Sequence, residues 1–508
     1  MDTRVRRRVV LGAAAGAAVV AAGGGTAAYL THRGGGTPAA ATPAGTASTP
    51  TPETTTGTAT TSYETRPDIT PPEITVKVAA GSDVSEGYVF VATKGGAPQA
   101  QLAMINNAGH LMYSNYFYRA ATDFRVQQYR GEPVLTFWQG VSATAHGSGM
   151  YTVLNQRYQQ IASVQGVNVN GDLHEFQFTD DDTALITAYH AVRRNLSAVG
   201  GPRDGWVWDG VIQEIDIDTG RLLFDWRTLD HVPISESYVG INADGNAGTG
   251  TIDDPYDYMH LNSAAKRDGD YLISSRNAQT AYKVDGRTGR IVWRLGGKKS
   301  TFAMGSGTDF HYQHHPRWVS DTRISLFDNH MTGHSRGLLI DLDEKSHRAT
   351  LHREYVSPEQ ILGRYQGNVQ VLDNGNVFVG WGDKPYFTEF AADGTVLYHA
   401  AFGGDGVNSY RAFRGRWAPR PADRPMAAAT STDSGMMRVF VSWNGMPVSR
   451  WRIATGNDPD ALDSVHDADS AGFETAVTLP AATYVRATAL DSDDNALGTS
   501  TMVTRFRA

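Results

Sequence analysis

Residues 257–297 read DYMHLNSAAKRDGDYLISSRNAQTAYKVDGRTGRIVWRLGG, four short runs of strand-forming residues separated by turns. His260 and Asn262 are two residues apart in the first run, so a strand directs both side chains to the same face. Arg-Asp-Gly-Asp at 267–270 predicts a hairpin turn, and the second strand ends at Arg276. The stretch therefore predicts a four-stranded unit that carries a His, an Asn and an Arg on its early strands.

The same pattern recurs along most of the chain. It is repeated over residues 87–115, 123–164, 172–226, 314–355 and 367–402, with turn sequences such as Asp-Asn-Gly at 373–375 between the strands. Six four-stranded meanders in succession predict a six-bladed β-propeller over residues 73–424. Residues 191–208 and 230–256 depart from the period, and long loops of this kind are either lids or tolerated surface excursions.

The last part of the chain, residues 425–508, has short alternating strands without the turn signature of the repeats. This pattern predicts a small β-sandwich of the immunoglobulin or fibronectin type III kind. The predicted fold class is therefore all-β throughout. No cluster of catalytic residue types occurs in the sandwich, and we interpret it as a packing module.

The N-terminus indicates export. Within residues 1–33, Arg4, Arg6, Arg7 and Arg8 precede an uncharged run rich in Ala, Gly and Val, which resembles a twin-arginine signal. Cleavage of this segment and its retention as a membrane anchor both stay open. Residues 34–72 are rich in Thr, Ala, Pro and Gly and predict a disordered linker. We expect an extracellular or cell-envelope protein.

Composition excludes several functions. The 508 residues include no cysteine, which excludes disulfides, thiolate catalysis and cysteine-ligated metals. The net charge is −8, and residues 1–33 carry five Arg and one Asp, so the remainder is acidic at −12. An acidic body disfavours nucleic acid as a partner. The oligomeric state is not predictable from these features.

Three of the sixteen histidines fall at equivalent places in the repeats. His174, His260 and His314 each lie on the predicted innermost strand of consecutive repeats, where side chains converge on the axis of a propeller. Arg276, Asn329 and His330 end second strands and can reach the same mouth. Imidazoles, an Arg and amides, with no obvious carboxylate among them, predict a pocket for an oxygen-rich anion such as sulfate or phosphate. A three-histidine zinc site is the alternative, which the positive charge of Arg276 disfavours.

The repeats resemble a known family. The strings DYMHLNSA, YLISSRNAQTAYKVD and GRIVWRLGG in the fourth repeat, QHHPRW with ISLFDNH in the fifth, and GNVQVLDNGNVFVGWG in the sixth are similar to arylsulfotransferases. The resemblance covers roughly residues 85–420. It implies a six-bladed propeller that moves a sulfuryl group from a phenolic sulfate ester to a phenol, with neither a nucleotide donor nor a cofactor.

The resemblance also implies roles for individual residues. His314, which follows Gln313, matches the nucleophile that forms a sulfohistidine in a ping-pong scheme. His174, His260, Asn262 and Arg276 match the other active-site positions. His315 follows His314 directly, so the nucleophile could be displaced by one residue; alternation sends one side chain inward and the other into the blade. Asn329, His330 and His315 complete the expected substrate-binding residues.

Two other functions stay open. The chain could be an envelope scaffold or binding module whose site has decayed. It could also be a quinoprotein, because VDGRTGRIVW at 284–293 resembles the Trp-docking turn of quinone-dependent propellers, although only this repeat has it complete. The transferase is the function that we favour.

Overall fold

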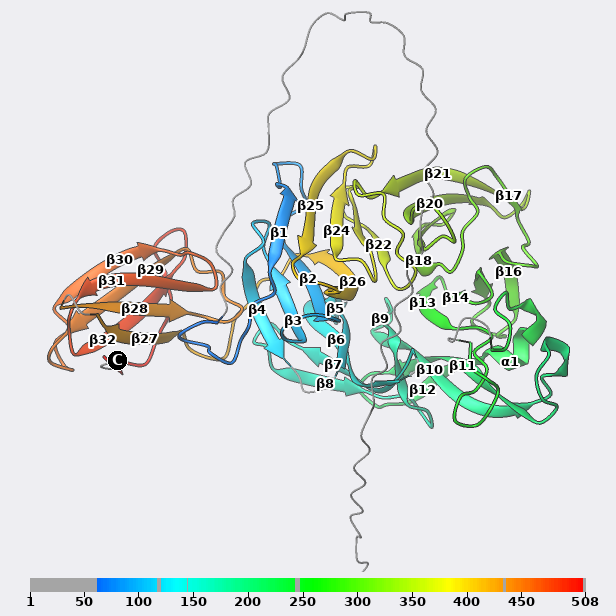
Figure 1. The fold of residues 1–508 in the computed structure, drawn as a ribbon, viewed down its shortest axis with the longest axis horizontal. Helices are drawn as coiled ribbons and strands as arrows, with labels where there is room; N and C mark the ends of the chain where they lie inside the picture. Colours follow the sequence, from blue (N-terminus) through cyan, green and yellow to red (C-terminus); the bar gives the residue numbers. More distant parts are fainter. Residues whose placement is uncertain (1–61, 117–119, 144, 243–246, 433–434, 506–508) are drawn as a thin grey trace, which may run out of the picture. The chain divides into compact units, whose positions relative to one another are not determined.

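The computed structural model describes residues 62–116, 120–143, 145–242, 247–432 and 435–505. The described chain is all-β, as predicted: Figure 1 shows strands throughout it, and its helical parts are the four-residue α1 (Thr228–His231) and the 3₁₀ turns Ser197–Val199 and Ile234–Glu236. No helix in these ranges is long and apolar enough to cross a membrane. The predicted signal or anchor at 1–33 and most of the predicted linker lie outside the described residues.

Part of the predicted linker is packed. Residues 62–72 are described, and in this stretch the side chain of Ile69 is fully buried while Tyr63 is 9% exposed. Both join a hydrophobic cluster with Val89, Val91 and Phe387. The low-complexity composition of the segment hides these two large side chains, so the packed chain begins earlier than the sequence indicates.

Antiparallel meanders make up the central part of the chain, and the second and third of them share one eight-stranded sheet. The second repeat contains β5 (Ala120–Tyr129), β6 (Glu132–Ala143), β7 (His146–Leu154) and β8 (Gln160–Val164), and the third contains β9 (Gly171–Phe178), β10 (Thr183–Arg194), β11 (Gly205–Asp216) and β12 (Leu222–Arg227). The fourth contains β13 (Leu261–Arg267), β14 (Asp270–Ser275), β15 (Thr280–Val284) and β16 (Ile291–Gly296). The fifth contains β18 (His314–Ser320), β19 (Arg323–Asp328), β20 (Arg336–Asp343) and β21 (Arg348–Val356), with the short β17 (Ala303–Met304) parallel to β21. The sixth contains β22 (Asn368–Val371), β23 (Val377–Gly380), β24 (Tyr386–Phe390) and β25 (Val396–Phe402).

The remaining repeat is assembled from both ends of this region. β26 (Asn408–Gly415) pairs antiparallel with β2 (Tyr88–Lys94), which continues to β3 (Gln101–Ile105) and β4 (Leu111–Tyr116). In the same way β1 (Ile74–Val78) adds to β25, the last strand of the sixth repeat. The sequence analysis did not identify β1 or β26 as strands. The two pairings tie the N-terminal and C-terminal ends of the repeats together by main-chain hydrogen bonds.

The first strands of the repeats meet one another. β5, β9, β13, β18, β22 and β26 each contact the next in this order, and β26 contacts β5. Apolar side chains fill the spaces between sheets: Ile212, Ile273 and Tyr282 share one cluster across the third and fourth repeats. Leu272, Leu326 and Trp293 share another. The six innermost strands thus form a closed cycle of contacts.

Local turn chemistry agrees with the predicted repeat. In the β13–β14 hairpin, Arg267 pairs with Asp270, and both central residues have positive φ, 50° for Asp268 and 84° for Gly269. Two positive φ values in a two-residue loop match the right-handed twist of the strands, and Asp-Gly is a favoured sequence for it. The turn therefore fixes the register that places Ser263 opposite Ser274.

Two further sheets follow the repeats. One contains β27 (Met426–Ser431), β28 (Met436–Ser442) and β31 (Glu474–Pro480). The other contains β29 (Arg450–Gly456), β30 (Ser464–Asp469), β32 (Tyr484–Leu490), β33 (Ala496–Thr499) and β34 (Val503–Thr504). Val439 of the first sheet and Trp451 and Val485 of the second lie in one hydrophobic cluster, so the two sheets share a core.

A buried ionic network connects the innermost strands. Glu175 on β9 bonds Arg125 on β5 at 2.9 Å, Arg317 on β18 at 2.6 Å and Arg411 on β26 at 3.2 Å. Asp123 on β5 adds a 2.8 Å bond to Arg411. The side chains of Glu175, Asp123 and Arg411 are fully buried. The facing guanidinium groups, Arg317 first, overcome the effect of burial and hold the pKa of Glu175 at about 2.

We predict that Glu175→Gln destabilises the protein by about 3–5 kcal/mol, because it leaves three buried guanidinium groups short of one negative charge. The matched control is Asp467→Asn, which removes the carboxylate of an exposed pair with Arg452 and should cost less than about 1 kcal/mol. Urea unfolding of both variants provides the measurement. Equal stability of Glu175→Gln and wild type would show that the network does not hold the strands together.

Candidate functional site

Three predicted histidines come together where the innermost strands begin. His174 lies on β9, His260 directly precedes β13, and His314 is the first residue of β18. The ring centroids of His174 and His260 are 4.9 Å apart. The ring of Tyr410 on β26 is close to two of them, with its centroid 5.6 Å from that of His174 and 6.4 Å from that of His314. All three residues are buried.

Two carboxylates stand behind two of these imidazoles. The Nδ1 atom of His260 is 2.6 Å from Oδ2 of Asp257, and Nδ1 of His174 bonds Oδ2 of Asp172. A carboxylate accepts hydrogen bonds, so in each ring the proton lies on Nδ1 and the lone pair on Nε2. The sequence-based expectation of a site without carboxylates is therefore wrong. Both acids are close in sequence to the histidines that they contact: Asp172 lies two residues before His174, and Asp257 lies three residues before His260.

Asp257 also fixes the backbone at His260. Its Oδ1 atom accepts the backbone N–H of His260 at 2.8 Å, and His260 has a φ of +48°. Burial alone would raise the pKa of Asp257, but the imidazoles of His260 and His146 bring it well below its usual value. His260 is thus the residue before β13, and the carboxylate of Asp257 holds it there. The prediction that His260 and Asn262 share a strand face is therefore wrong.

His314 has the same tautomer through a different partner. Its Nδ1 is 2.7 Å from Oδ1 of Asn329, whose own amide donates to the carbonyls of Gly363 and Gln366. Asn329 can therefore only accept from the ring, so Nδ1 carries the proton and Nε2 carries the lone pair. The backbone N–H of Gln366 donates to that Nε2 at 3.2 Å. Asn329 is fully buried and acts on the site through His314.

The fourth repeat holds the strand that begins with His314. The side-chain amide of Gln313 donates to the carbonyls of Ser275 at 2.9 Å and Thr280 at 3.2 Å. The amide of Asn262 donates to the carbonyl of Gln313 at 2.7 Å, while its Oδ1 is buried without a partner among the described residues. Asn262 thus positions the residue before His314. This explains in physical terms why a Gln precedes the His and why an Asn lies on the neighbouring strand.

Arg276 supplies a cation near the histidines. Its guanidinium lies over the rings of Tyr312 at 4.6 Å and Tyr365 at 5.2 Å, and it donates to the side chain of Asn277 at 2.9 Å. These contacts within the described residues are two aromatic rings and an amide, and burial lowers the pKa of Arg276. The predicted role of Arg276 in anion binding stays a prediction, with which these contacts are compatible.

Electrostatics keep the imidazoles neutral. Burial lowers the pKa of His260 to about 4, although Asp257 opposes the shift. Burial also holds the pKa of His314 well below its ordinary value, and the positive charge of Arg276 adds to the effect. At neutral pH both rings are uncharged bases, a state suited to nucleophilic attack or proton uptake.

The remaining predicted residues lie elsewhere. His330 follows β19 at a partly exposed position, where its ring is 5.8 Å from that of His311. His315 is buried on another side of β18: its Nδ1 is 3.1 Å from the carbonyl of Val369, and it lines a separate cavity. A break in strand register between His314 and Arg317 accompanies the divergence of the two adjacent histidines.

Sequence reasoning missed His146. Its Nε2 is 3.2 Å from Oδ2 of Asp257, and its ring is 5.5 Å from that of His260. His146, Asp257 and His260 are buried and close enough to hold a metal ion together. The proposed zinc alternative used His174 and His314 instead. No signal marked His146, because it begins the third strand of the second repeat and not an innermost strand.

The two predicted insertions meet beside this group. Residues 191–208 lengthen β10 and β11 so that Arg194 pairs with Gly205. The backbone N–H of Trp208 donates to the carbonyl of Tyr256 from the second insertion, and the N–H of Tyr256 donates to the carbonyl of Trp206. The ring of Trp208 is 5.1 Å from that of His146. The insertions thus border the histidine cluster, which is where a lid would have to be.

Comparison with known proteins identifies one family. The model of the family described as arylsulfotransferase (ASST) matches residues 125–403, more than half of the chain. No curated protein matches.

Solved structures show only weak similarity. A protein of unknown function from Bacteroides caccae is 12% identical over 65% of this chain and 98% of its own, with a TM-score of 0.38. Saccharomyces cerevisiae Sqt1 is 12% identical over 71% of this chain and 79% of its own, with a TM-score of 0.31. An ACO/RPE65 chimera is 9% identical over 61% and 70%, also with a TM-score of 0.31. Similarity at this level carries no argument about function.

We predict that His260 titrates with a midpoint of about 4 rather than near the ordinary histidine value of about 6.5. Asp257→Asn should lower the midpoint further, because the carboxylate is the group that favours the protonated ring. ¹⁵N NMR of histidine-labelled protein measures both, with His260→Gln to assign the signal. A midpoint at or above the ordinary value would contradict the buried, Nδ1-protonated state described above.

Proposed function

Since this chain belongs to the arylsulfotransferase family, we propose that it moves a sulfuryl group from a phenolic sulfate ester to a phenol through a sulfohistidine at His314. The scheme needs neither a nucleotide donor nor a cofactor. The observation that carries the proposal is the state of His314. Its imidazole is buried and neutral, its Nε2 is unprotonated and accepts only the 3.2 Å bond from the backbone N–H of Gln366, and the guanidinium of Arg276 lies nearby.

In the first half-reaction, Nε2 of His314 attacks the sulfur of the ester. The N–S bond forms as the bond between sulfur and the aryl oxygen breaks, and the released phenoxide takes a proton from solvent. Arg276 offsets the negative charge of the sulfuryl oxygens and of the leaving oxygen as it develops. Asn329 keeps the ring in position and accepts the Nδ1–H bond, which strengthens as the ring becomes positive.

In the second half-reaction, a phenol oxygen attacks the same sulfur and the N–S bond breaks. The acceptor must lose its proton, and in this scheme Nε2 of His260 or His174 receives that proton and then returns it to solvent. Asp257 and Asp172 orient these rings and stabilise their protonated forms, as carboxylates do behind catalytic histidines. The donor and the acceptor are the only partners that this scheme requires.

We also propose the architecture in which this chemistry takes place. The closed cycle of six innermost strands, and the pairing of β26 with β2, support a six-bladed β-propeller. The two sheets after Met426 with their shared core support an immunoglobulin-like or fibronectin-like sandwich. The arginine-rich start and the apolar run of residues 1–33 support export, with or without retention as a membrane anchor.

We predict that purified protein releases 4-nitrophenol from 4-nitrophenyl sulfate when a phenol is present, with the parallel double-reciprocal plots of a ping-pong reaction. His314→Ala should lower kcat/KM by about 10³-fold or more, because it removes the attacking atom. Arg276→Met should lower it by about 10²-fold through loss of charge stabilisation.

Two controls separate the nucleophile from its neighbours. His352→Ala changes a histidine whose side chain is 41% exposed on β21, and it should leave turnover unchanged. His315→Ala should retain the ping-pong pattern, because that ring bonds the carbonyl of Val369 away from the cluster. Turnover by His314→Ala at the wild-type rate would refute the mechanism. A wild type inactive toward all aryl sulfates tested would favour the scaffold alternative.

A further inference from the structure

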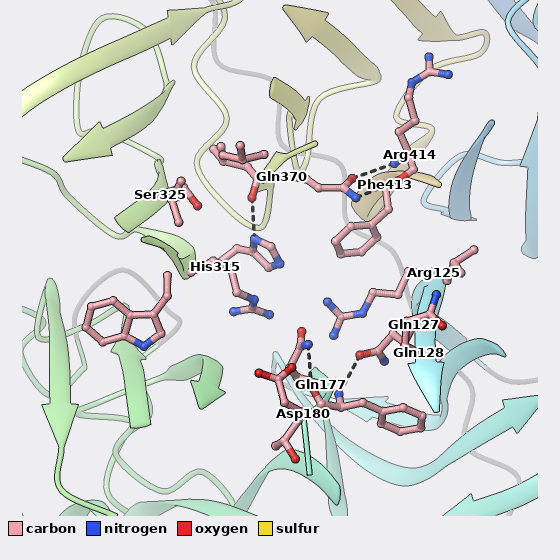
Figure 2. Close-up of a pocket in the computed structure, with 18 of the residues that line it drawn as sticks. Arg125, Gln127, Gln128, Gln177, Asp180, His315, Ser325, Gln370, Phe413 and Arg414 are labelled. Carbon is pink, nitrogen blue, oxygen red and sulfur yellow. Dashed lines mark hydrogen bonds between the residues drawn. The ribbon is translucent and has the colours of Figure 1, made fainter. Parts of the chain in front are cut away.

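A cavity of about 710 Å³ lies on the same innermost strands as the histidine cluster. Its lining includes Arg125 on β5, Gln177 on β9, His315 and Arg317 on β18, and Arg414 on β26, and it contains neither the three clustered histidines nor Arg276. Figure 2 shows Arg125, Gln177, His315 and Arg414 around this space. Gln177 and Arg317 are each three residues further along their strands than His174 and His314, which is about 10 Å of strand. The cavity is therefore distinct from the proposed active site.

The ionic network separates the two sites. Arg125 and Arg317 both line the cavity and both bond Glu175, which is fully buried. The network contains the three cations Arg125, Arg317 and Arg411 and two carboxylates, those of Glu175 and Asp123. The inner end of the cavity consequently carries an excess of one positive charge, which favours an acidic ligand group.

His315 presents an acceptor at this inner end. Its Nδ1 faces the carbonyl of Val369 at 3.1 Å and therefore carries the proton, so Nε2 carries a lone pair. That Nε2 is buried without a hydrogen-bond partner in the described part of the chain, and the residue is 3% exposed. Burial lowers the pKa of His315, and the neighbouring Arg317, Arg411 and Arg125 lower it further, so the ring remains neutral. The Nε2 atom of His315 is thus a neutral hydrogen-bond acceptor beside three cations. An uncharged donor such as a hydroxyl suits it, because a cationic donor would be repelled by the arginines.

Unpartnered donors lie in the same wall. The Nε atom of Arg125, a residue 5% exposed, and the indole N–H of Trp318 are both buried with no acceptor within the described residues. In Figure 2 the side chains of Arg125 and His315 point toward one another across the cavity. Unsatisfied buried groups of opposite hydrogen-bonding kind, in one cavity, indicate that a polar molecule completes them.

The rim has the opposite charge. Asp180 and Asp182 line the opening together with the amides of Gln128 and Gln177. Carboxylates there repel an anionic group at the mouth and accept hydrogen bonds from hydroxyls. A ligand therefore fits with its acidic group at the inner end, near Arg125 and Arg317. One of its hydroxyls bonds His315, and its other hydroxyls face the rim.

We propose that this cavity binds a small polyhydroxylated carboxylate of the uronic-acid type. One hydroxyl donates to Nε2 of His315, the carboxylate accepts from Arg125 and from the indole N–H of Trp318, and the outer hydroxyls bond the rim. The volume lies within the range of small-molecule sites and exceeds what one sugar ring needs. The proposal concerns a second site and stands independently of the sulfuryl transfer at His314.

Isothermal titration at constant ionic strength tests it, with D-glucuronate as the probe and D-glucose and acetate as matched comparisons. We expect glucuronate to bind one site with a Kd of roughly 1 mM or tighter, and glucose and acetate each to bind at least about tenfold more weakly. His315→Leu, which removes the acceptor at similar volume, should weaken glucuronate binding by about tenfold. His352→Leu on the outer strand β21 should leave it unchanged.

Each other result would overturn the proposal. If acetate and glucuronate bind with equal affinity, the cavity is a simple anion site. If glucose and glucuronate bind with equal affinity, the carboxylate of the ligand contributes nothing to binding. No heat of binding with glucuronate would mean that water alone satisfies the buried groups. If His315→Leu does not fold, Trp318→Phe removes only the indole N–H and should weaken glucuronate binding severalfold; unchanged affinity in that variant would count equally against the proposal.

Discussion

Glu175 is the residue on which the arrangement of the innermost strands depends. Its buried carboxylate bonds guanidinium groups from β5, β18 and β26, and Arg411 continues to the backbone carbonyl of Asn262 on β13 at 2.8 Å. A buried ion is costly unless its partners are in place, so this network penalises any arrangement in which one strand is missing or displaced. The strand that arrives last in sequence, β26, contributes the fully buried Arg411 and pairs with β2. Closure of the cycle and completion of the network are therefore one event.

The network also explains why one set of strands can carry two different polar sites. On one side are the imidazoles of His174, His260 and His314, each with its Nδ1 atom hydrogen-bonded to a carboxylate or amide oxygen. On the other is a cavity with a surplus positive charge and the lone pair of His315. The ion pairs of Arg411 with Glu175 and Asp123 belong to the strands that carry both sites.

The sequence was sufficient for the repeated meander and for much of the candidate site. Alternation and Asp-Gly turns fixed the strands of the fourth repeat to within a few residues, because hairpin register is local. The equivalent placement of His174, His260 and His314 in successive repeats predicted their convergence. The Gln-His pair was recognised only by resemblance, and the structure supplies its physical reason in the bonds from Gln313 to the fourth repeat.

What could not be predicted depends on contacts between distant parts of the chain. The pairings of β26 with β2 and of β1 with β25 join segments more than 300 residues apart, and no local pattern encodes such a partner. His146 meets Asp257 across 111 positions for the same reason. Asp172 and Asp257 were different, because a carboxylate two or three residues before a site histidine is a local signal that could have been used.

The covalent intermediate is the central claim, and its location tests the account most directly. Protein mixed with ³⁵S-labelled 4-nitrophenyl sulfate without an acceptor, quenched in alkali and digested, should yield one labelled peptide, with the sulfuryl group on Nε2 of His314. Addition of a phenol before the quench should discharge it. Label on His260, His174 or His315, or turnover with no labelled peptide at all, would contradict the assignment of His314 as the nucleophile.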